Sequence, residues 1–189
     1  IRTVNMLGCH DGIPLLDLKG ILAEDRIQKL IDIIVSRGGY VKDLHGQKNI
    51  YYQVNATYFS ALGEDERKML LARALQIFMP GKPQIWYLDL FAGKNDHEAV
   101  RRAGESGHKE INRTNISVDQ IAEGLKKDVV QKQLALIRMR NTHKAFSEGA
   151  EVAISGGESS LQIRWEYNSA FAILNVNFES GTYTIVESR

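Results

Sequence analysis

Residues 4–12 read Val-Asn-Met-Leu-Gly-Cys-His-Asp-Gly, a short apolar run that gives way at Gly8 to small and polar residues. The apolar part of this segment predicts a buried strand, and the polar residues predict a loop at the carboxyl end of that strand. His10 and Asp11 lie in the loop and are the first candidate functional residues. Taken alone, such a pair at a strand end is more often a structural hydrogen-bonded pair than a catalytic one.

Two helices and a second strand follow the first strand. Residues 23–37 predict a helix with one apolar face, because isoleucine and leucine recur there at helical spacing. Residues 64–79 predict a second, largely buried helix, which the Pro-Gly-Lys-Pro sequence of residues 80–83 ends. Residues 84–88 then predict a short strand. This order predicts an α/β fold in which the strands 4–7 and 84–88 pair in parallel through a right-handed connection.

This predicted sheet is incomplete by itself. Two strand-and-helix units cannot close a barrel, and they leave an exposed strand edge that natural domains avoid. The chain also opens without Met, directly on a strand-like segment. We interpret it as the later part of a longer protein whose further strands precede Ile1.

Two long loops and one helix are predicted next. Residues 38–55 and 91–117 are rich in polar and charged residues and show little periodicity. A loop as long as residues 91–117 inside a compact domain is usually functional or disordered. Residues 118–146 predict a helix, with the strongest signal over residues 129–139.

The end of the chain predicts a small antiparallel sheet. After Gly149 the apolar period changes from helical to alternating, over segments 161–167, 170–176 and 182–186. The side chains expected to face a core shared with the helix 129–140 are those of Leu161, Ile163 and Trp165.

Composition excludes several classes of function. Among the 189 residues, 24 Lys and Arg balance 23 Asp and Glu, so a net charge of +1 gives no electrostatic reason for binding nucleic acid or an anionic membrane. No apolar run approaches the length of a membrane span. The single cysteine, Cys9, excludes an internal disulfide and any multi-cysteine zinc site. The histidines show no metal-ligand spacing, and we predict no metal site.

Five segments in order carry a more specific signal than any single residue. They are Leu7-Gly8-Cys9-His10-Asp11-Gly12-Ile13, Tyr52-Gln53-Val54-Asn55-Ala56-Thr57-Tyr58, Phe78-Met79-Pro80-Gly81-Lys82-Pro83-Gln84, Ala92-Gly93-Lys94-Asn95-Asp96 and Glu110-Ile111-Asn112-Arg113. The first resembles the His-Asp-Gly signature of glycoside hydrolase family 13. The other four resemble segments of the sucrose phosphorylases within that family, so the chain resembles the carboxyl-terminal part of such an enzyme.

This resemblance implies a fold and a division into domains. The family folds as a (β/α)8 TIM barrel followed by a smaller β domain. The chain would then supply the last two βα units of the barrel, with their loops and the final helix, over residues 1–148. Residues 149–189 would form the carboxyl-terminal antiparallel β domain.

The resemblance also implies a reaction. A sucrose phosphorylase transfers glucose from sucrose to inorganic phosphate with retention, giving α-glucose 1-phosphate and fructose. It implies no cofactor and no metal, a cytoplasmic location, no nucleic-acid or membrane partner, and an assembly that could be a homodimer. The nucleophile and the acid/base that a retaining mechanism needs would lie upstream of this chain, which by itself is expected to be inactive.

Particular residues match the family's site. Asp11 matches the carboxylate that stabilises the transition state, and His10 matches a contact to a sugar hydroxyl. Arg113 matches an arginine that reaches the glucose. Tyr52 and Gln53 match an acceptor-site loop that serves fructose and phosphate in turn.

Two alternatives stay open at this point. A relative could act on sucrose 6'-phosphate or glucosylglycerate, although Tyr52 stands where a basic residue would suit a sugar phosphate. Alternatively, the chain could be a non-catalytic carbohydrate-binding domain, because it lacks the nucleophile and the acid.

Overall fold

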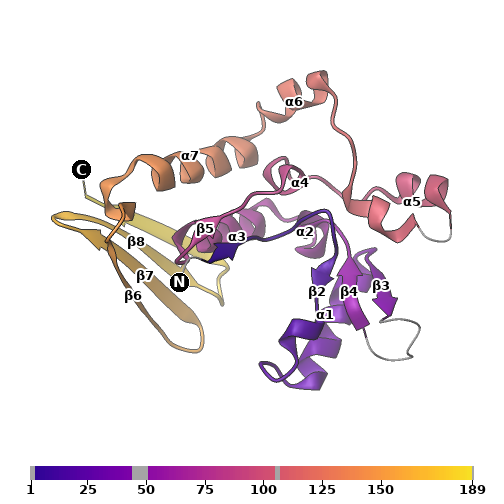
Figure 1. Cartoon of the computed structure of the whole chain (residues 1–189), viewed down its shortest axis with the longest axis horizontal. Coiled ribbons are helices and arrows are strands. Elements are labelled where there is room, and N and C mark those ends of the chain that lie inside the picture. The colour runs from indigo at the N-terminus through magenta and orange to yellow at the C-terminus, as the bar shows by residue number, and fades with distance from the viewer. Residues whose placement is uncertain (1–2, 44–50, 105–106, 189) are drawn as a thin grey trace. The chain divides into compact units, whose positions relative to one another are not determined.

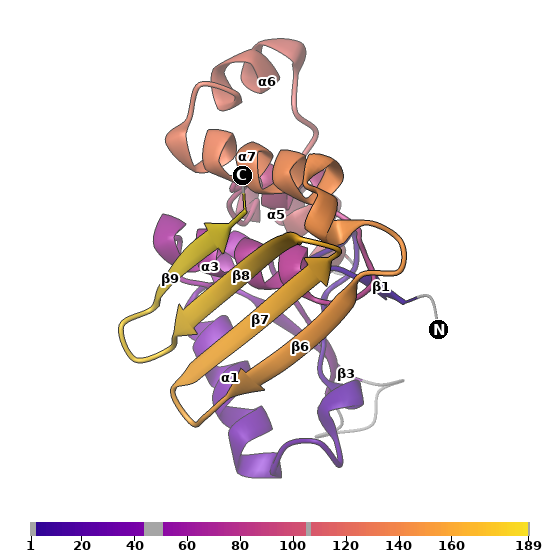
Figure 2. The same ribbon diagram turned by 90° about the vertical axis from the view of Figure 1, so that its left-hand side faces the viewer.

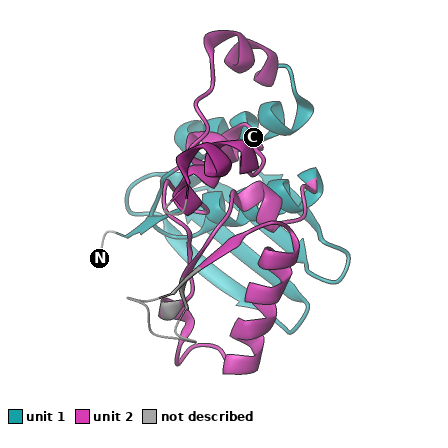
Figure 3. Ribbon diagram, turned by 90° about the vertical axis from the view of Figure 1, so that its right-hand side faces the viewer, with its two compact units in different colours: residues 1–6, 66–84, 126–189 teal, residues 7–65, 85–125 magenta. Residues whose placement is uncertain are grey.

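A computed structural model describes residues 3–43, 51–104 and 107–188. The chain forms two compact units, each assembled from separate segments (Figure 3). Unit 1 comprises residues 1–6, 66–84 and 126–189, and unit 2 comprises residues 7–65 and 85–125. Helices and sheets occur in both, which agrees with the predicted α/β class.

The largest sheet lies in unit 1 and is antiparallel. Its strands β6 (Glu151–Gly156), β7 (Ser160–Tyr167), β8 (Ala170–Asn177) and β9 (Thr182–Glu187) are hydrogen-bonded in sequence order (Figure 2). Tyr167 pairs with Ala170, so only two residues turn the chain between β7 and β8. The predicted sheet is confirmed, and β6 adds a strand that was not predicted separately.

The inner face of this sheet follows the predicted alternation. Ile163 and Trp165 are buried, Leu161 is half-buried, and the residues between them are exposed or half-exposed. The face packs on α3 (Glu66–Phe78) and on the 3-10 helix η3 (Lys144–Phe146). The prediction that the 129–140 helix shares this core is only partly right. The helix α7 (Asp128–Thr142) packs along α3 and reaches the sheet through Arg140.

Unit 1 also holds a short parallel ladder. β1 (Val4–Asn5) pairs in parallel with β5 (Lys82–Pro83), so the predicted direction of pairing is confirmed, but the partner of the first strand lies just before the predicted segment 84–88. The ladder is more exposed than predicted, because 57% of Val4 is accessible to solvent. The predicted strand 84–88 is wrong: Gln84 donates a last bond to Asn5, and the chain then forms helix α4 (Tyr87–Leu90). A short apolar run fits a buried helix as well as a strand, which is why periodicity misassigned it.

Unit 2 contains a second antiparallel sheet where a loop was predicted. Strands β2 (Ile13–Pro14), β4 (Tyr51–Asn55) and β3 (Tyr40–Asp43) lie in that spatial order (Figure 1). The predicted loop 38–55 is therefore wrong for residues 40–43 and 51–55. Each strand is too short to show a period of its own, and the pairing of β2 with β4 is long-range.

The helix α1 (Glu24–Ser36) covers this small sheet. It matches the predicted helix 23–37 and ends at Ser36, and Gly38 after the C-cap residue Arg37 takes a φ of 87° that closes the last turn. Its predicted apolar face supplies part of one core. The buried residues of that core are Leu15, Ile27, Ile31, Ile34, Val54 and Ala56.

The remaining elements are short helices. The 3-10 helix η1 (Leu16–Leu18) precedes α1, and α2 (Tyr58–Ala61) follows β4. The predicted loop 91–117 is wrong in part, because it contains α5 (His97–Ala103) and the 3-10 helix η2 (Gly107–Asn112). The predicted helix 118–146 is divided into α6 (Val118–Gly124), α7 and η3. Among the described residues, no helix has both the length and the apolar character to cross a membrane.

Candidate active site

The loop after β1 is held in shape by hydrogen bonds to its backbone, all within unit 2. The backbone N–H of Gly8 donates to the buried Asp89 carboxylate at 2.8 Å. The Asn112 side-chain amide donates to the carbonyls of Cys9, at 2.8 Å, and Asp11, at 2.7 Å. Arg113 Nε donates to the intervening carbonyl of His10 at 3.0 Å. Three successive backbone carbonyls of the loop thus accept hydrogen bonds from two adjacent residues. Asn112 is the last residue of η2, and Arg113 follows it.

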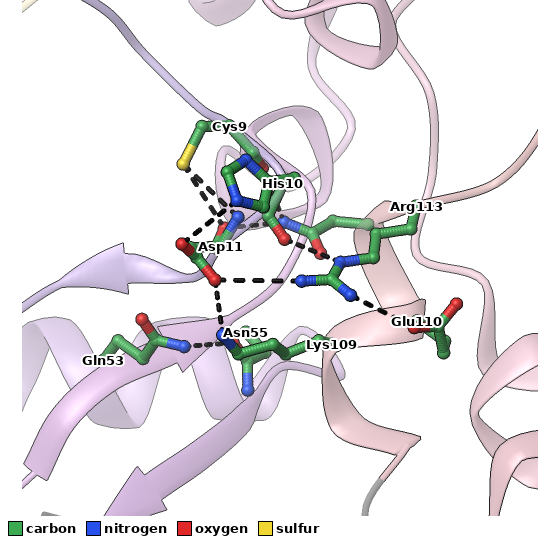
Figure 4. Close-up of polar contacts among 9 residues, drawn as sticks. Cys9, His10, Asp11, Gln53, Asn55, Lys109, Glu110 and Arg113 are labelled. Carbon is green, nitrogen blue, oxygen red and sulfur yellow. Dashed lines mark hydrogen bonds and ion pairs between the residues drawn. The ribbon is translucent and has the colours of Figure 1, made fainter.

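Three basic side chains surround the Asp11 carboxylate (Figure 4). Lys109 Nζ lies 2.5 Å from Oδ1, His10 Nε2 lies 3.4 Å from Oδ2, and Arg113 Nη2 lies 3.8 Å from Oδ1. The hydrogen bond from Lys109 lowers the pKa of Asp11 below its ordinary value. Partial burial opposes this shift, while the charges of Lys109, His10 and Arg113 reinforce it. Asp11 is therefore a fixed negative charge at neutral pH.

Arg113 joins this carboxylate to a second one. Its Nη1 lies 3.4 Å from Glu110 Oε1, so its guanidinium lies between two acids. Arg113 and Glu110 also line a surface hollow of about 440 Å³, together with Arg102, Asp96 and Thr114. A polar ligand such as a sugar hydroxyl could therefore reach the guanidinium from this hollow.

The structure brings together three of the five predicted site residues. His10, Asp11 and Arg113 form one cluster, in which the His10 side chain is 61% exposed and its ring lies 6.1 Å from that of Trp86. Gln53 lies on β4, which packs against η2, and its buried amide donates to Asn55 at 2.9 Å. The backbone of Tyr52 lies in β4, but its side chain is outside the described residues.

Sequence reasoning missed two residues that contact Asp11 directly. Asn112 belongs to a segment that carried the family resemblance, yet only its neighbour Arg113 was singled out. Lys109 had no signal, because one lysine in a charged loop is usually solvated. In the part of the chain that the structure describes, no group of three His, Cys, Asp or Glu is placed to hold a metal ion.

Comparison with known proteins adds an independent line of evidence. No family model matches the chain. The sucrose 6(F)-phosphate phosphorylase of Ilumatobacter coccineus is 50% identical over 98% of this chain, and that of Thermoanaerobacterium thermosaccharolyticum is 43% identical over 98%. The sucrose phosphorylase of Streptococcus mutans is 33% identical over 100%. The chain spans 37%, 39% and 40% of the length of these three relatives.

The fold gives the same result. The crystal structure of sucrose 6F-phosphate phosphorylase from Thermoanaerobacter thermosaccharolyticum matches with a TM-score of 0.93 and 37% identity. The match covers 100% of this chain and 38% of the other. Likeness of this extent in sequence and in fold places the chain in the class of the sugar phosphorylases. Within that class, the chain belongs to the sucrose phosphorylase family, as the five sequence segments predicted.

Proposed function

We propose that this chain is the carboxyl-terminal part of a phosphorylase that transfers glucose, with retention, from a sucrose-type donor to inorganic phosphate. The observation that carries the proposal is the 50% identity to a sucrose 6(F)-phosphate phosphorylase over 98% of the chain. The products would be α-glucose 1-phosphate and fructose or its 6-phosphate. The cytoplasm, where inorganic phosphate is abundant, suits such a reaction.

The same proposal includes the architecture. Residues 1–148 would supply the last two βα units of a (β/α)8 barrel, and residues 149–189 a separate antiparallel β domain. The parallel pairing of β1 with β5 supports this proposal, because a barrel is built from parallel strands. The position of His10 and Asp11 just after β1 also supports it, since active sites of such barrels lie at the carboxyl ends of the strands.

Each site residue has a proposed role. Asp11 would stabilise the oxocarbenium-like transition state, in which positive charge builds on the glucosyl ring. A carboxylate that is already ionised and held in place needs no reorganisation at that moment. His10 and Arg113 would bind hydroxyl groups of the glucosyl unit. Tyr52 and Gln53 would contact the fructosyl unit and then phosphate.

The glucosyl donor could be sucrose 6'-phosphate or unmodified sucrose. The relatives with 50% and 43% identity are sucrose 6(F)-phosphate phosphorylases, whereas the sucrose phosphorylase of Streptococcus mutans is 33% identical. This difference favours a phosphorylated donor. Tyr52 favours unmodified sucrose, because a neutral phenol offers a phosphate group only a hydrogen bond, whereas a basic residue would also pair with its charge. Relative kcat/KM for the two donors decides between them.

The test uses the intact protein that contains this chain. It is incubated with sucrose or sucrose 6'-phosphate, with and without inorganic phosphate, and the sugars are followed by proton NMR. We expect phosphate-dependent cleavage and glucose 1-phosphate in the α configuration. The 189-residue chain alone should be inactive, because retention needs a nucleophile and an acid/base and neither role is proposed for any of its residues.

Two other outcomes would contradict the proposal. Release of free glucose at a rate independent of phosphate would identify a hydrolase. Saturable sugar binding without any turnover would identify a carbohydrate-binding protein instead.

The Arg113→Ala variant of the intact protein should bind the glucosyl donor more weakly. Loss of a charge-assisted hydrogen bond of about 1.5–3 kcal/mol raises KM by roughly 10–150-fold. Arg113→Lys should recover only part of this loss, because a lysine keeps the charge but not the planar fork of donors. Steady-state kinetics measures both variants. An unchanged KM in Arg113→Ala would mean that Arg113 does not bind the donor and only stabilises the loop through the His10 carbonyl.

A further inference from the structure

Two side chains of η2 reach the same target. A 3-10 helix has about three residues per turn, so residues three apart lie above one another. Lys109 and Asn112 are spaced in this way on η2, and both contact Asp11. The helix itself is anchored, because Ile111 is fully buried and its carbonyl accepts from the backbone N–H of Asp96 at 2.9 Å.

Asn112 acts on the backbone. An amide group offers two N–H donors, and both are used on the loop, one on Cys9 and one on Asp11. The side chain is 98% buried, so water does not compete for these bonds. The direction in which Asp11 leaves the loop is therefore set by Asn112.

Lys109 acts on the carboxylate. Its ammonium lies 2.5 Å from Oδ1, closer than His10 or Arg113 lies to either oxygen. The two side chains are about one-third exposed, at 34% for Lys109 and 39% for Asp11. The bond thus fixes the rotation of the Asp11 side chain and leaves part of the carboxylate open to a ligand.

We propose that Lys109 and Asn112 are positioning residues for Asp11, with Asn112 holding the backbone from which it projects and Lys109 holding its carboxylate in place. The catalytic consequence of this positioning rests on the proposed function. A displacement of about 1 Å in a catalytic group can cost on the order of 10²-fold in rate. Residues that do not touch the sugar would thereby control the turnover number.

The charged groups that face Asp11 determine the pH test. They are Lys109, His10 and Arg113. Glu110 forms an ion pair with Arg113. Without Lys109, the pKa of Asp11 rises toward its ordinary value because the largest stabilising contact is gone. Since the ionised form is the active one, the acidic limb of the pH–rate profile should move to higher pH.

The first experiment compares Lys109→Met with Lys109→Arg in the intact protein. Lys109→Met should lower kcat by about 10-fold or more with little change in KM, by the same positional argument, and shift the acidic limb upward. Lys109→Arg should restore most of the activity and the original limb. Lys132→Met is the matched control. It also replaces a lysine that forms an ion pair, at 2.6 Å to Asp128, but this exposed pair lies on α7 and not on η2.

Asn112→Leu tests the backbone contact with a side chain of similar size. It should lower kcat by at least as much as Lys109→Met and leave the acidic limb in place, because it removes no charge. Should this variant fail to fold, Lys109→Met still decides the proposal, since Lys109 is partly exposed and its replacement leaves the core intact.

A second readout is independent of turnover. In the intact protein labelled with [4-13C]aspartate, the Asp11 carboxyl signal is assigned by its absence in Asp11→Asn. Its titration should move to higher pH in Lys109→Met and stay in place in Lys132→Met. An unmoved titration overturns the role of Lys109 even if the intact protein shows no phosphorolysis. A moved titration in an inactive protein supports positioning and rejects only the proposed reaction.

Discussion

Asp11→Asn should reduce kcat of the intact phosphorylase by about 10²–10³, which corresponds to roughly 3–4 kcal/mol of transition-state stabilisation. The replacement keeps the shape of the side chain and removes its charge. The interaction is strongest when positive charge has built up on the glucosyl ring, so the loss should fall on kcat rather than on KM. Steady-state phosphorolysis across donor concentrations measures both constants.

The control for this variant is Asp17→Asn, which removes an exposed carboxylate elsewhere in the same unit. It should leave kcat unchanged. A wild-type kcat for Asp11→Asn would mean that His10 and Asp11 are the structural pair that such a sequence most often forms. The assignment of Asp11 to the transition state would then be wrong.

Trp165→Ala should lower the free energy of unfolding of this part of the intact protein by about 3–5 kcal/mol. The indole is 93% buried, and its Nε1–H donates to the carbonyl of Phe78 at 2.6 Å. The Arg140 guanidinium lies 4.2 Å above the ring, and the Phe146 ring is 5.4 Å away. Removing the ring leaves a cavity and an unpaired carbonyl between β7 and α3. A loss of this size is a large part of a typical stability of about 5–15 kcal/mol.

Urea unfolding followed by circular dichroism tests this prediction. Trp165→Phe keeps a ring and removes the hydrogen bond, so it should cost less than Trp165→Ala. Phe178→Ala is the control for loss of an aromatic ring at a site that is 47% exposed, and it should change stability by about 0.5 kcal/mol or less. Equal losses in Trp165→Ala and Phe178→Ala would show that the sheet does not depend on this contact.

The sequence predicted those elements whose pattern is local. The helix α1 repeats its apolar residues over several turns, and β7 alternates over eight residues, so each carries its own period. The strands β3 and β4 do not, because their order depends on a partner across the chain. The segment 84–88 failed for a different reason: a short apolar run is compatible with both kinds of structure.

The site likewise contains residues that the sequence predicts and residues that it does not. His10, Asp11 and Arg113 could be predicted because they lie in segments that resemble a known family. Lys109 could not, since its importance comes only from a contact with Asp11 across 98 positions in sequence. A contact of this kind has no signature in the residues on either side of it.

The side chains that bind residues 9–11 lie 98–103 positions later in the sequence. Asn112 and Arg113 bind the carbonyls of residues 9–11, and Lys109 binds the Asp11 carboxylate, so the groups proposed to place Asp11 lie at the two ends of this interval. We expect the interval, which includes β4, to tolerate changes in length and surface as long as Asp89, Lys109, Asn112 and Arg113 keep these contacts. Under the proposed function, an interval that varies while Asp11 stays in place would account for relatives named for sucrose, sucrose 6(F)-phosphate, glucosylglycerol and glucosylglycerate.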